Sequence, residues 1–256
     1  MAKAKSKIGE EKCNNFGSKM RIINYRKTTD IDVLFVEYNW MATGVQYSHF
    51  KKGDIKCPYE PRVYNKGYVG EGEYKVWENN KPTSAYRKWH NMLERCYDEK
   101  KQIKCPKYKD CTTCDEWLNF QEYAKWHEKY YYELDNEEVH LDKDILIPGN
   151  KIYSPSTCCF VPKTINSIFN TRDKRDNLPT GVYSHGKKYK SRCAIRGKII
   201  HIGIYDTVSE AFLAYKIVKE SYIKQIADEY KDVIDSKVYK AMYDYEVSML
   251  TKEELM

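Results

Sequence analysis

The sequence predicts an α+β protein with several domains, and two observations lead to this fold class. Short runs of alternating apolar and polar residues, typical of half-buried strands, occur near both ends of the chain. Between them lie stretches whose apolar residues recur at helical spacing. We therefore expect a small N-terminal β module, a helical block that contains a β-hairpin, and a C-terminal three-stranded sheet with a helix. The 256 residues are enough for two to three small domains of this kind.

Composition narrows the class of protein. The 44 Lys and Arg exceed the 37 Asp and Glu, so the formal charge is +7, which is a weak indication of a polyanionic partner until the charge is located. No run approaches the roughly 18 apolar residues that a membrane helix needs. The basic N-terminus lacks the apolar stretch of a signal peptide. We expect a cytoplasmic protein without membrane contact, whose nine cysteines are reduced thiols or metal ligands.

The N-terminal part is predicted to be a basic tail, 1–18, followed by the β module, 19–75. Alternating residues predict short strands over 21–25 and 31–36, and Lys52-Gly53-Asp54 indicates a turn. The glycine-rich stretch that ends this segment superficially resembles a dinucleotide-binding fingerprint. Its spacing is wrong and no helix start follows it, so we exclude nucleotide binding there.

The middle block, 83–172, is predicted to contain helices on both sides of a hairpin. Pro82-Thr83-Ser84 is a helix start signal, and Pro148-Gly149-Asn150 has the residue types of a turn between two strands. The predicted elements are, in order, helices over 86–96 and 117–127, strands over 139–142 and 151–153, and a helix over 162–170.

The third block, 178–230, is predicted to be a three-stranded sheet backed by one helix. Turns at Gly186 and Gly197 separate the strands, and Thr207 and Glu210 have the spacing of a capping box at the start of the helix. The predicted strands cover 181–183, 189–195 and 198–203. The remaining residues, 231–256, are predicted to be a helical extension.

Cations are concentrated in this sheet. No acidic residue lies between Asp176 and Asp206, and alternation places Lys190 and Arg192 on the face that points away from the helix. Such a face suits duplex DNA, because cations contact phosphates and longer side chains reach base edges. The alternative is a solvated polar face of an ordinary α+β domain. The candidate DNA-binding residues are Lys187, Lys188, Lys190, Arg192, Arg196 and Lys198.

The residue order of the third block also carries a family resemblance. The matching residues are Gly181-Val182-Tyr183, the basic strand, Ile202-Gly203-Ile204-Tyr205-Asp206-Thr207, and Glu210-Ala211 with Ala214-Tyr215. This order resembles the Apetala/ethylene-response-factor type of DNA-binding domain. The resemblance implies DNA binding through the sheet, with Lys190, Arg192 and Arg196 as the leading contacts.

The middle block carries a second, more specific order. Its residues are Trp89-x-x-Met92-x-x-Arg95-Cys96, Cys114-Asp115-Glu116-Trp117, Leu141-Asp142-Lys143-Asp144, Tyr153-Ser154-Pro155-x-x-Cys158 and Asn166. This order resembles the phage HNH-type homing endonucleases, which often carry an Apetala-type domain as their DNA-binding part. The resemblance implies an HNH-like nuclease block in which a hairpin and a helix hold one divalent metal. A phage-encoded protein of this kind would act in the cytoplasm of the host cell.

The resemblance also assigns candidate roles at the hairpin. Asp142 is the candidate strand ligand of Mg²⁺ or Mn²⁺, and Asp144 lies on the same side as a second carboxylate. Asn166 is the candidate helix ligand, and Asn170 follows it one turn later. Asn150 resembles the central asparagine of the motif, which is often structural.

The chain departs from the family at the base. A histidine should follow Asp142, but Lys143 stands there, and a lysine near its ordinary pKa of about 10.4 is a poor base at neutral pH. His140 points to the same side of the strand as Asp142 and is a candidate displaced base, with a structural hydrogen bond as its alternative role. Catalytic candidates are therefore His140, Asp142 and Lys143.

The cysteines of the middle block allow a structural zinc site. Cys111 and Cys114 have the spacing with which two thiolates hold one tetrahedral zinc ion. Cys96 and Cys158 lie within the motif residues and complete a candidate set of four ligands. The alternative is that these cysteines are small apolar core residues.

Three functions follow from the sequence. The first is a phage-type HNH endonuclease that hydrolyses duplex DNA with a divalent metal. The second is a catalytically inactive DNA-binding protein on a degenerate HNH fold, acting as a regulator or an anti-defence factor. The third is an interaction module whose basic face meets an acidic protein. Lys143 favours the second function, whereas Asp142, Asp144 and Asn166 favour the first.

Overall fold

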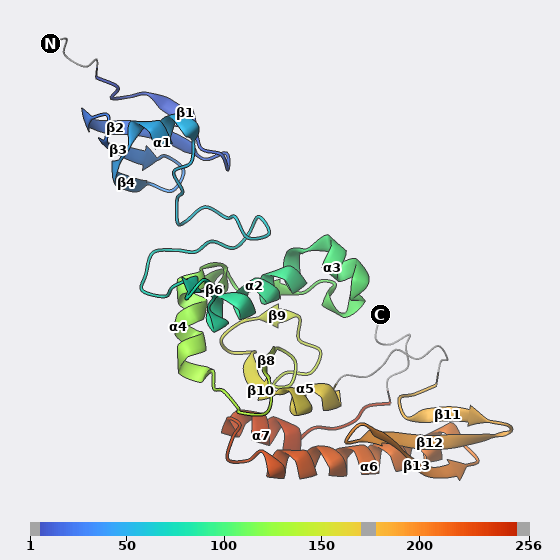
Figure 1. Cartoon of the computed structure of the whole chain (residues 1–256). Helices are drawn as coiled ribbons and strands as arrows, with labels where there is room; N and C mark the ends of the chain where they lie inside the picture. The colour runs from blue at the N-terminus through green and yellow to red at the C-terminus, as the bar shows by residue number, and fades with distance from the viewer. Residues whose placement is uncertain (1–5, 170–177, 250–256) are drawn as a thin grey trace. The chain divides into compact units, whose positions relative to one another are not determined.

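The computed structural model describes residues 6–169 and 178–249. Its contacts divide the chain into two compact units. The first contains Met1–Lys129 with Lys151–Ser154, and the second contains Tyr130–Asn150 with Pro155–Met256. The predicted block 83–172 therefore contributes to both units. Figure 1 labels the elements of each unit, which show the mixed α+β class that the sequence predicts.

The first unit begins with a four-stranded antiparallel sheet in the order β1-β2-β3-β4. Its strands are β1 (Glu11–Cys13), β2 (Lys19–Lys27), β3 (Asp30–Phe35) and β4 (Trp40–Val45), followed by α1 (Tyr47–Lys52). Strand β1 lies inside the segment 1–18, which is predicted to be a tail, and it pairs antiparallel with β2. The Glu11 carboxylate on β1 binds Lys19 and Arg21 on β2. Met20, Phe35 and Phe50 are fully buried in the core of this sheet, which confirms a β module.

The rest of the first unit is mainly helical. The predicted helix over 86–96 is present, whereas the predicted helix over 117–127 is divided at Asn119 into a 3-10 turn and an α-helix. The elements are β5 (Trp77–Glu78), β6 (Lys81–Pro82), α2 (Ser84–Tyr97), α3 (Glu99–Lys104), η1 (Pro106–Tyr108), β7 (Thr112–Thr113), η2 (Asp115–Leu118) and α4 (Phe120–Tyr130). The hydroxyl of Thr83 accepts the N–H of Tyr86 and so caps α2 at the predicted start signal. Trp89 and Trp117 are fully buried between these elements.

The glycine-rich stretch, residues 67–72, is a loop of the first unit whose backbone packs closely against helical side chains. A Cβ at Gly67 would lie 2.3 Å from Leu93 Cδ1 and 2.8 Å from Trp89 Cζ2. A Cβ at Gly70 would lie 2.2 Å from Asn119 Oδ1. Both glycines thus allow the backbone to lie directly against side chains of the helical part.

The hairpin of the second unit differs from the predicted one. Strand β8 (Val139–Asp142) pairs antiparallel with β10 (Cys159–Pro162), whereas β9 (Ile152–Tyr153) pairs in parallel with β7 of the first unit. The prediction that 151–153 is the hairpin partner is therefore wrong. All four residues of β10 are buried, so β10 supplies the apolar partner that β8 needs, and Ile152 of β9 is exposed. Helix α5 (Lys163–Phe169) follows β10 directly, which matches the predicted helix over the described residues.

The C-terminal part of the second unit contains the predicted three-stranded sheet and helix. Strands β11 (Val182–His185), β12 (Lys188–Ile195) and β13 (Lys198–Tyr205) form an antiparallel sheet with β12 in the middle. Helix α6 (Val208–Glu229) starts with the predicted capping box between Thr207 and Glu210. A short helix, α7 (Ser236–Tyr243), follows within the predicted extension.

Helix α6 belongs to two hydrophobic cores. Its first half places Phe212 and Tyr215 against the sheet. Its second half places Ile223 and Ile226 in a core that also contains Val161 of β10 and residues of α5 and α7. In Figure 1 this helix, drawn in red-orange, runs beside both the sheet and α5. The hairpin and the sheet are therefore parts of one unit, although the prediction assigned them to separate domains.

Candidate functional site

Strand β8 presents alternate residues to the core and to the candidate site. Val139 and Leu141 are buried, whereas His140 and Asp142 are half-buried on the other side. The prediction that His140 and Asp142 share a side of the strand is thus confirmed. In the pairing with β10, His140 lies opposite Val161, and Asp142 lies opposite the buried Cys159.

The Asp142 carboxylate organises the turn at the end of β8. Its Oδ1 accepts the backbone N–H of Asp144 at 2.9 Å and that of Ile145 at 2.8 Å. Burial raises the pKa of Asp142 to about 6, and the neighbouring charge of Asp144 adds to this shift. Two carboxylates held close together in a partly dry site are an arrangement that a divalent cation stabilises.

Lys143, the residue after Asp142, is a buried, paired cation. Its side chain is 9% exposed, and Nζ donates to Asp144 Oδ2 at 3.1 Å and to the backbone oxygen of Asn150 at 2.7 Å. The Asn150 amide donates in return to the backbone oxygen of Lys143 at 2.7 Å. An ammonium in these contacts donates hydrogen bonds and has no lone pair to accept a proton from water. The Asn150 side chain thereby holds the loop that follows β8.

His140 lies next to Asn166, the candidate ligand on α5. Asn166 Nδ2 lies 2.9 Å from His140 Nδ1, and His140 Nε2 lies 3.3 Å from a carboxylate oxygen of the exposed Glu138. With the amide nitrogen of Asn166 as the donor, His140 Nδ1 accepts this hydrogen bond. The structure thus brings two predicted site residues together and gives His140 the hydrogen bond that was its alternative role.

The carboxylates at the end of β8 suit a hard cation. Mg²⁺ and Mn²⁺ prefer oxygen ligands, which Asp142 and Asp144 supply. Within the described ranges, 6–169 and 178–249, no group of three or more His, Cys, Asp or Glu side chains is arranged around a common point. A metal here would therefore be held by this carboxylate pair together with water or a phosphate oxygen. The candidate ligand Asn170 lies outside the described residues.

The cysteines of the candidate zinc set are buried or half-buried. Cys96, Cys111 and Cys158 are buried, and burial raises the pKa of the half-buried Cys114 thiol. A raised pKa favours the thiol over the thiolate that binds zinc. Over the part of the chain that the structure describes, no three cysteines form a metal-binding group. Zinc binding stays a prediction, which the zinc content of the purified protein would test.

The outer face of the C-terminal sheet is the second candidate site. Ser191 and Cys193 are buried toward α6, so Lys190 and Arg192 point outward as predicted. Arg192 lies over the ring of Tyr183 at 5.4 Å from its centroid, and Lys190 lies opposite Tyr183 in the pairing of β11 with β12. This cation and ring pair from adjacent strands forms the centre of the face.

Two other predicted DNA-binding residues, Lys188 and Arg196, form ion pairs with carboxylates of this protein. Arg196 has a φ of 48° in the turn between β12 and β13, and its N–H donates to the Tyr222 hydroxyl at 3.0 Å. Its guanidinium binds Glu229 at the end of α6, so it points away from the outer face. Lys188 forms an exposed ion pair with Asp206 at 2.8 Å. Lys187 and Lys198 are exposed at the two turns of the sheet.

The sequence reasoning missed the apolar part of the outer face. Ile199 is 70% exposed and Ile204 is 46% exposed. Ile204 lies opposite Lys190, Ile199 lies opposite Ala194, and His201 lies opposite Arg192. No pattern in the sequence placed them, because their position depends on the pairing of β12 with β13, in which residues directly opposite each other share a face.

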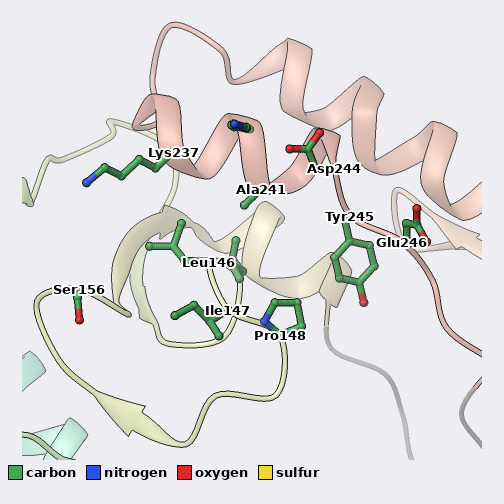
Figure 2. A pocket seen from close by; sticks show the side chains of 11 residues that line it. Leu146, Ile147, Pro148, Ser156, Lys237, Ala241, Asp244, Tyr245 and Glu246 are labelled. Atoms are coloured by element: carbon green, nitrogen blue, oxygen red, sulfur yellow. The ribbon is translucent and has the colours of Figure 1, made fainter.

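A cavity of about 650 Å³ lies in the second unit between the loop after β8 and helix α7. Figure 2 shows Leu146, Ile147 and Pro148 on one side and Ala241 and Tyr245 on the other. The residues predicted as catalytic or DNA-binding do not line this cavity.

Comparison with known proteins gives no relative for this chain: no model of a protein family, no curated protein and no solved structure matches it. The resemblances to the Apetala-type domain and to the HNH endonucleases are therefore based only on the residue patterns described above. In the described part of the chain, none of the helices combines the length and the apolar character needed to cross a membrane.

Proposed function

We propose that this protein binds duplex DNA through the outer face of the sheet β11–β13. The observation that carries the proposal is the outward placement of Lys190 and Arg192 on the middle strand of a sheet whose residues, 182–205, include no acid. Phosphates attract such cations, and a strand face is narrow enough to enter the major groove. A short Apetala-like sheet would thus position the protein on its target.

The salt dependence of binding tests this proposal, because each phosphate contact releases counterions. We expect Lys190→Ala and Arg192→Ala each to weaken duplex binding and to lower the slope of log affinity against log salt by about one. Arg196→Ala is the matched control: it removes the same charge from a side chain that binds Glu229. Equal losses in all three variants, or no salt dependence in the wild type, would contradict the proposal.

We further propose that the hairpin β8–β10 and helix α5 form a metal-dependent phosphodiesterase site. The order of strand, loop, strand and helix supports this activity, with Asp142 at the end of the first strand and Asn166 in the helix. Asp142 and Asp144 would hold Mg²⁺ or Mn²⁺, which stabilises charge on the phosphate when bound. His140 would take the proton of the attacking water, after Asn166 releases its Nδ1.

A second candidate function is DNA binding without cleavage. Lys143 favours it, because its buried ammonium is paired with Asp144 and with the backbone of Asn150. This cation competes with a metal for the same carboxylate.

A nicking assay on supercoiled plasmid with Mg²⁺ or Mn²⁺ decides between the two candidates. The first predicts nicking by the wild type and its loss in Asp142→Ala and His140→Ala, with duplex binding unchanged in both variants. Duplex binding without nicking by the wild type would establish the second. Nicking that persists in Asp142→Ala would place the activity elsewhere.

A further inference from the structure

The outer face of the sheet combines cations with exposed apolar side chains. Ile199 and Ile204 on β13 are 70% and 46% exposed. Strands in a sheet lie about 4.8 Å apart, so Ile204 is a direct neighbour of Lys190 across the ladder. A single exposed isoleucine needs no explanation. Here, however, two of them lie on the face that carries Lys190 and Arg192.

A β-bulge brings these isoleucines to the same face. Along a regular strand, residues 199 and 204 would point to opposite sides, because side chains alternate. The register shifts between Ser191 and Arg192, so Ser191 pairs with Gly203 but Arg192 pairs with His201. Ile202 is the extra residue, and it packs partly buried against the core beneath the sheet. Beyond the bulge, Ile204 therefore joins Ile199 on the outer face.

The surface fits a partner that presents anionic groups beside small apolar groups. Duplex DNA has this combination in its major groove, where the 5-methyl group of thymine lies between two phosphate backbones. We propose that Ile199 and Ile204 contact thymine methyl groups and give the sheet a preference for thymine-containing sites. This inference rests on the proposed binding of duplex DNA by the same face.

The spacing of the two side chains restricts the site. Ile199 and Ile204 are five residues apart on a strand that rises about 3.3 Å per residue, which gives at most about 16 Å. Base pairs are about 3.4 Å apart along the helix. The two contacted thymines therefore lie within about five base-pair steps of each other.

Replacing thymine by deoxyuridine tests the contact, because it removes only the 5-methyl group. The probe is a short duplex selected from a random pool by the full-length wild type, prepared once with thymine and once with deoxyuridine. Burying a methyl group is worth about 0.8 kcal/mol, so each contact accounts for about 4-fold in affinity, and the two together for about 15-fold. We expect the wild type to prefer the thymine duplex by this factor.

Variants of the protein test whether the two isoleucines cause the preference for thymine. The double variant Ile199→Ser with Ile204→Ser should bind the two duplexes equally, with the salt dependence of the wild type. Ile217→Ser, which changes a 61% exposed isoleucine on α6, should keep the preference. Because each result is a ratio for one protein preparation, partial unfolding of a variant does not affect it.

The outcomes separate this inference from the proposed function. Equal binding of both duplexes by the wild type would overturn the inference and leave DNA binding intact. A preference retained by the double isoleucine variant would also overturn it. Lys190→Ala should weaken binding to both duplexes without removing the preference. No binding to any duplex would overturn both the inference and the proposed function.

Discussion

Lys143 and Asn150 bind each other twice across the start of the loop between β8 and β10. The lysine ammonium donates to the backbone oxygen of Asn150, and the asparagine amide donates to the backbone oxygen of Lys143, both at 2.7 Å. The pair closes residues 143–150 into a small ring next to the Asp142 carboxylate. The shape of the candidate metal site therefore depends on two residues that need not touch a metal.

Loss of the asparagine amide should loosen this ring. We expect Asn150→Ala to lower the free energy of unfolding by about 1–3 kcal/mol, because the buried backbone oxygen of Lys143 loses its donor. Urea unfolding measures the change. The adjacent, exposed Lys151→Ala should cost less than about 0.5 kcal/mol. Similar losses in both variants would contradict the structural role of Asn150.

The raised pKa of Asp142 lowers the free energy of unfolding as the pH rises, whereas most carboxylates in folded proteins raise it. Its folded pKa of about 6 lies above the ordinary 3.8, so folding favours the protonated form. This contribution is complete below about pH 4 and is lost as the pH rises through 6. Asp142→Asn keeps an oxygen for the two backbone N–H groups and should stabilise the protein by about 1–3 kcal/mol at pH 8. Urea unfolding at pH 4 should show a much smaller gain, and equal gains at both pH values would refute the assignment.

His127 on α4 acts in the opposite sense. Burial lowers its pKa to about 4 from the ordinary 6.5, so folding favours the neutral ring. The stability that this provides is present above pH 6.5 and is lost as the pH falls toward 4. His127→Phe should remove about 1–3 kcal/mol of the acid-induced loss over this range. The free energy of unfolding against pH is the measurement, and an unchanged slope between pH 4 and 6.5 in His127→Phe would contradict the prediction.

Alanine substitutions at two glycines next to the C-terminal sheet distinguish the cost of backbone strain from the cost of steric overlap. Gly181 and Gly186 have φ values of +85° and +62°, so alanine is strained at both positions by about 1–2 kcal/mol. A Cβ at Gly181 would also lie 2.1 Å from the Tyr215 ring, whereas a Cβ at Gly186 meets nothing within 4 Å. Gly181→Ala should therefore cost about 1–3 kcal/mol more than Gly186→Ala in thermal or urea unfolding. Equal costs would mean that Tyr215 moves aside freely.

Local sequence patterns predicted the positions of strands and helices better than they predicted which strands pair with each other. Alternation along β12 correctly placed Lys190 outward and Cys193 inward, because period-two burial is a local property of a strand. Thr207 and Glu210 formed their capping box for the same reason, since they are three residues apart.

Pairing and direction needed contacts that are distant in sequence. The choice of β10 over β9 as the partner of β8 depends on burial of Cys159 and Val161 in the core shared with α6. The short runs 151–153 and 159–162 do not themselves reveal this burial. Arg196 points toward α6 because of a left-handed turn and of Glu229, 33 residues later. Ile204 reached the outer face through a bulge that alternation alone does not predict.

Because helix α6 belongs to two hydrophobic cores, it limits which segments of this protein can be exchanged for segments of another protein. A graft that exchanges only residues 178–205 would have to fit its new sheet onto Phe212 and Tyr215, and a graft that includes α6 would remove Ile223 and Ile226 from the core around Val161. A chimera that preserves both cores must therefore keep α6 together with the sheet, with β8 and β10, and with α5 and α7. It must also retain Lys151–Ser154, because β9 pairs with β7 of the first unit. In this chain the exchangeable module is larger than the recognition sheet that it carries.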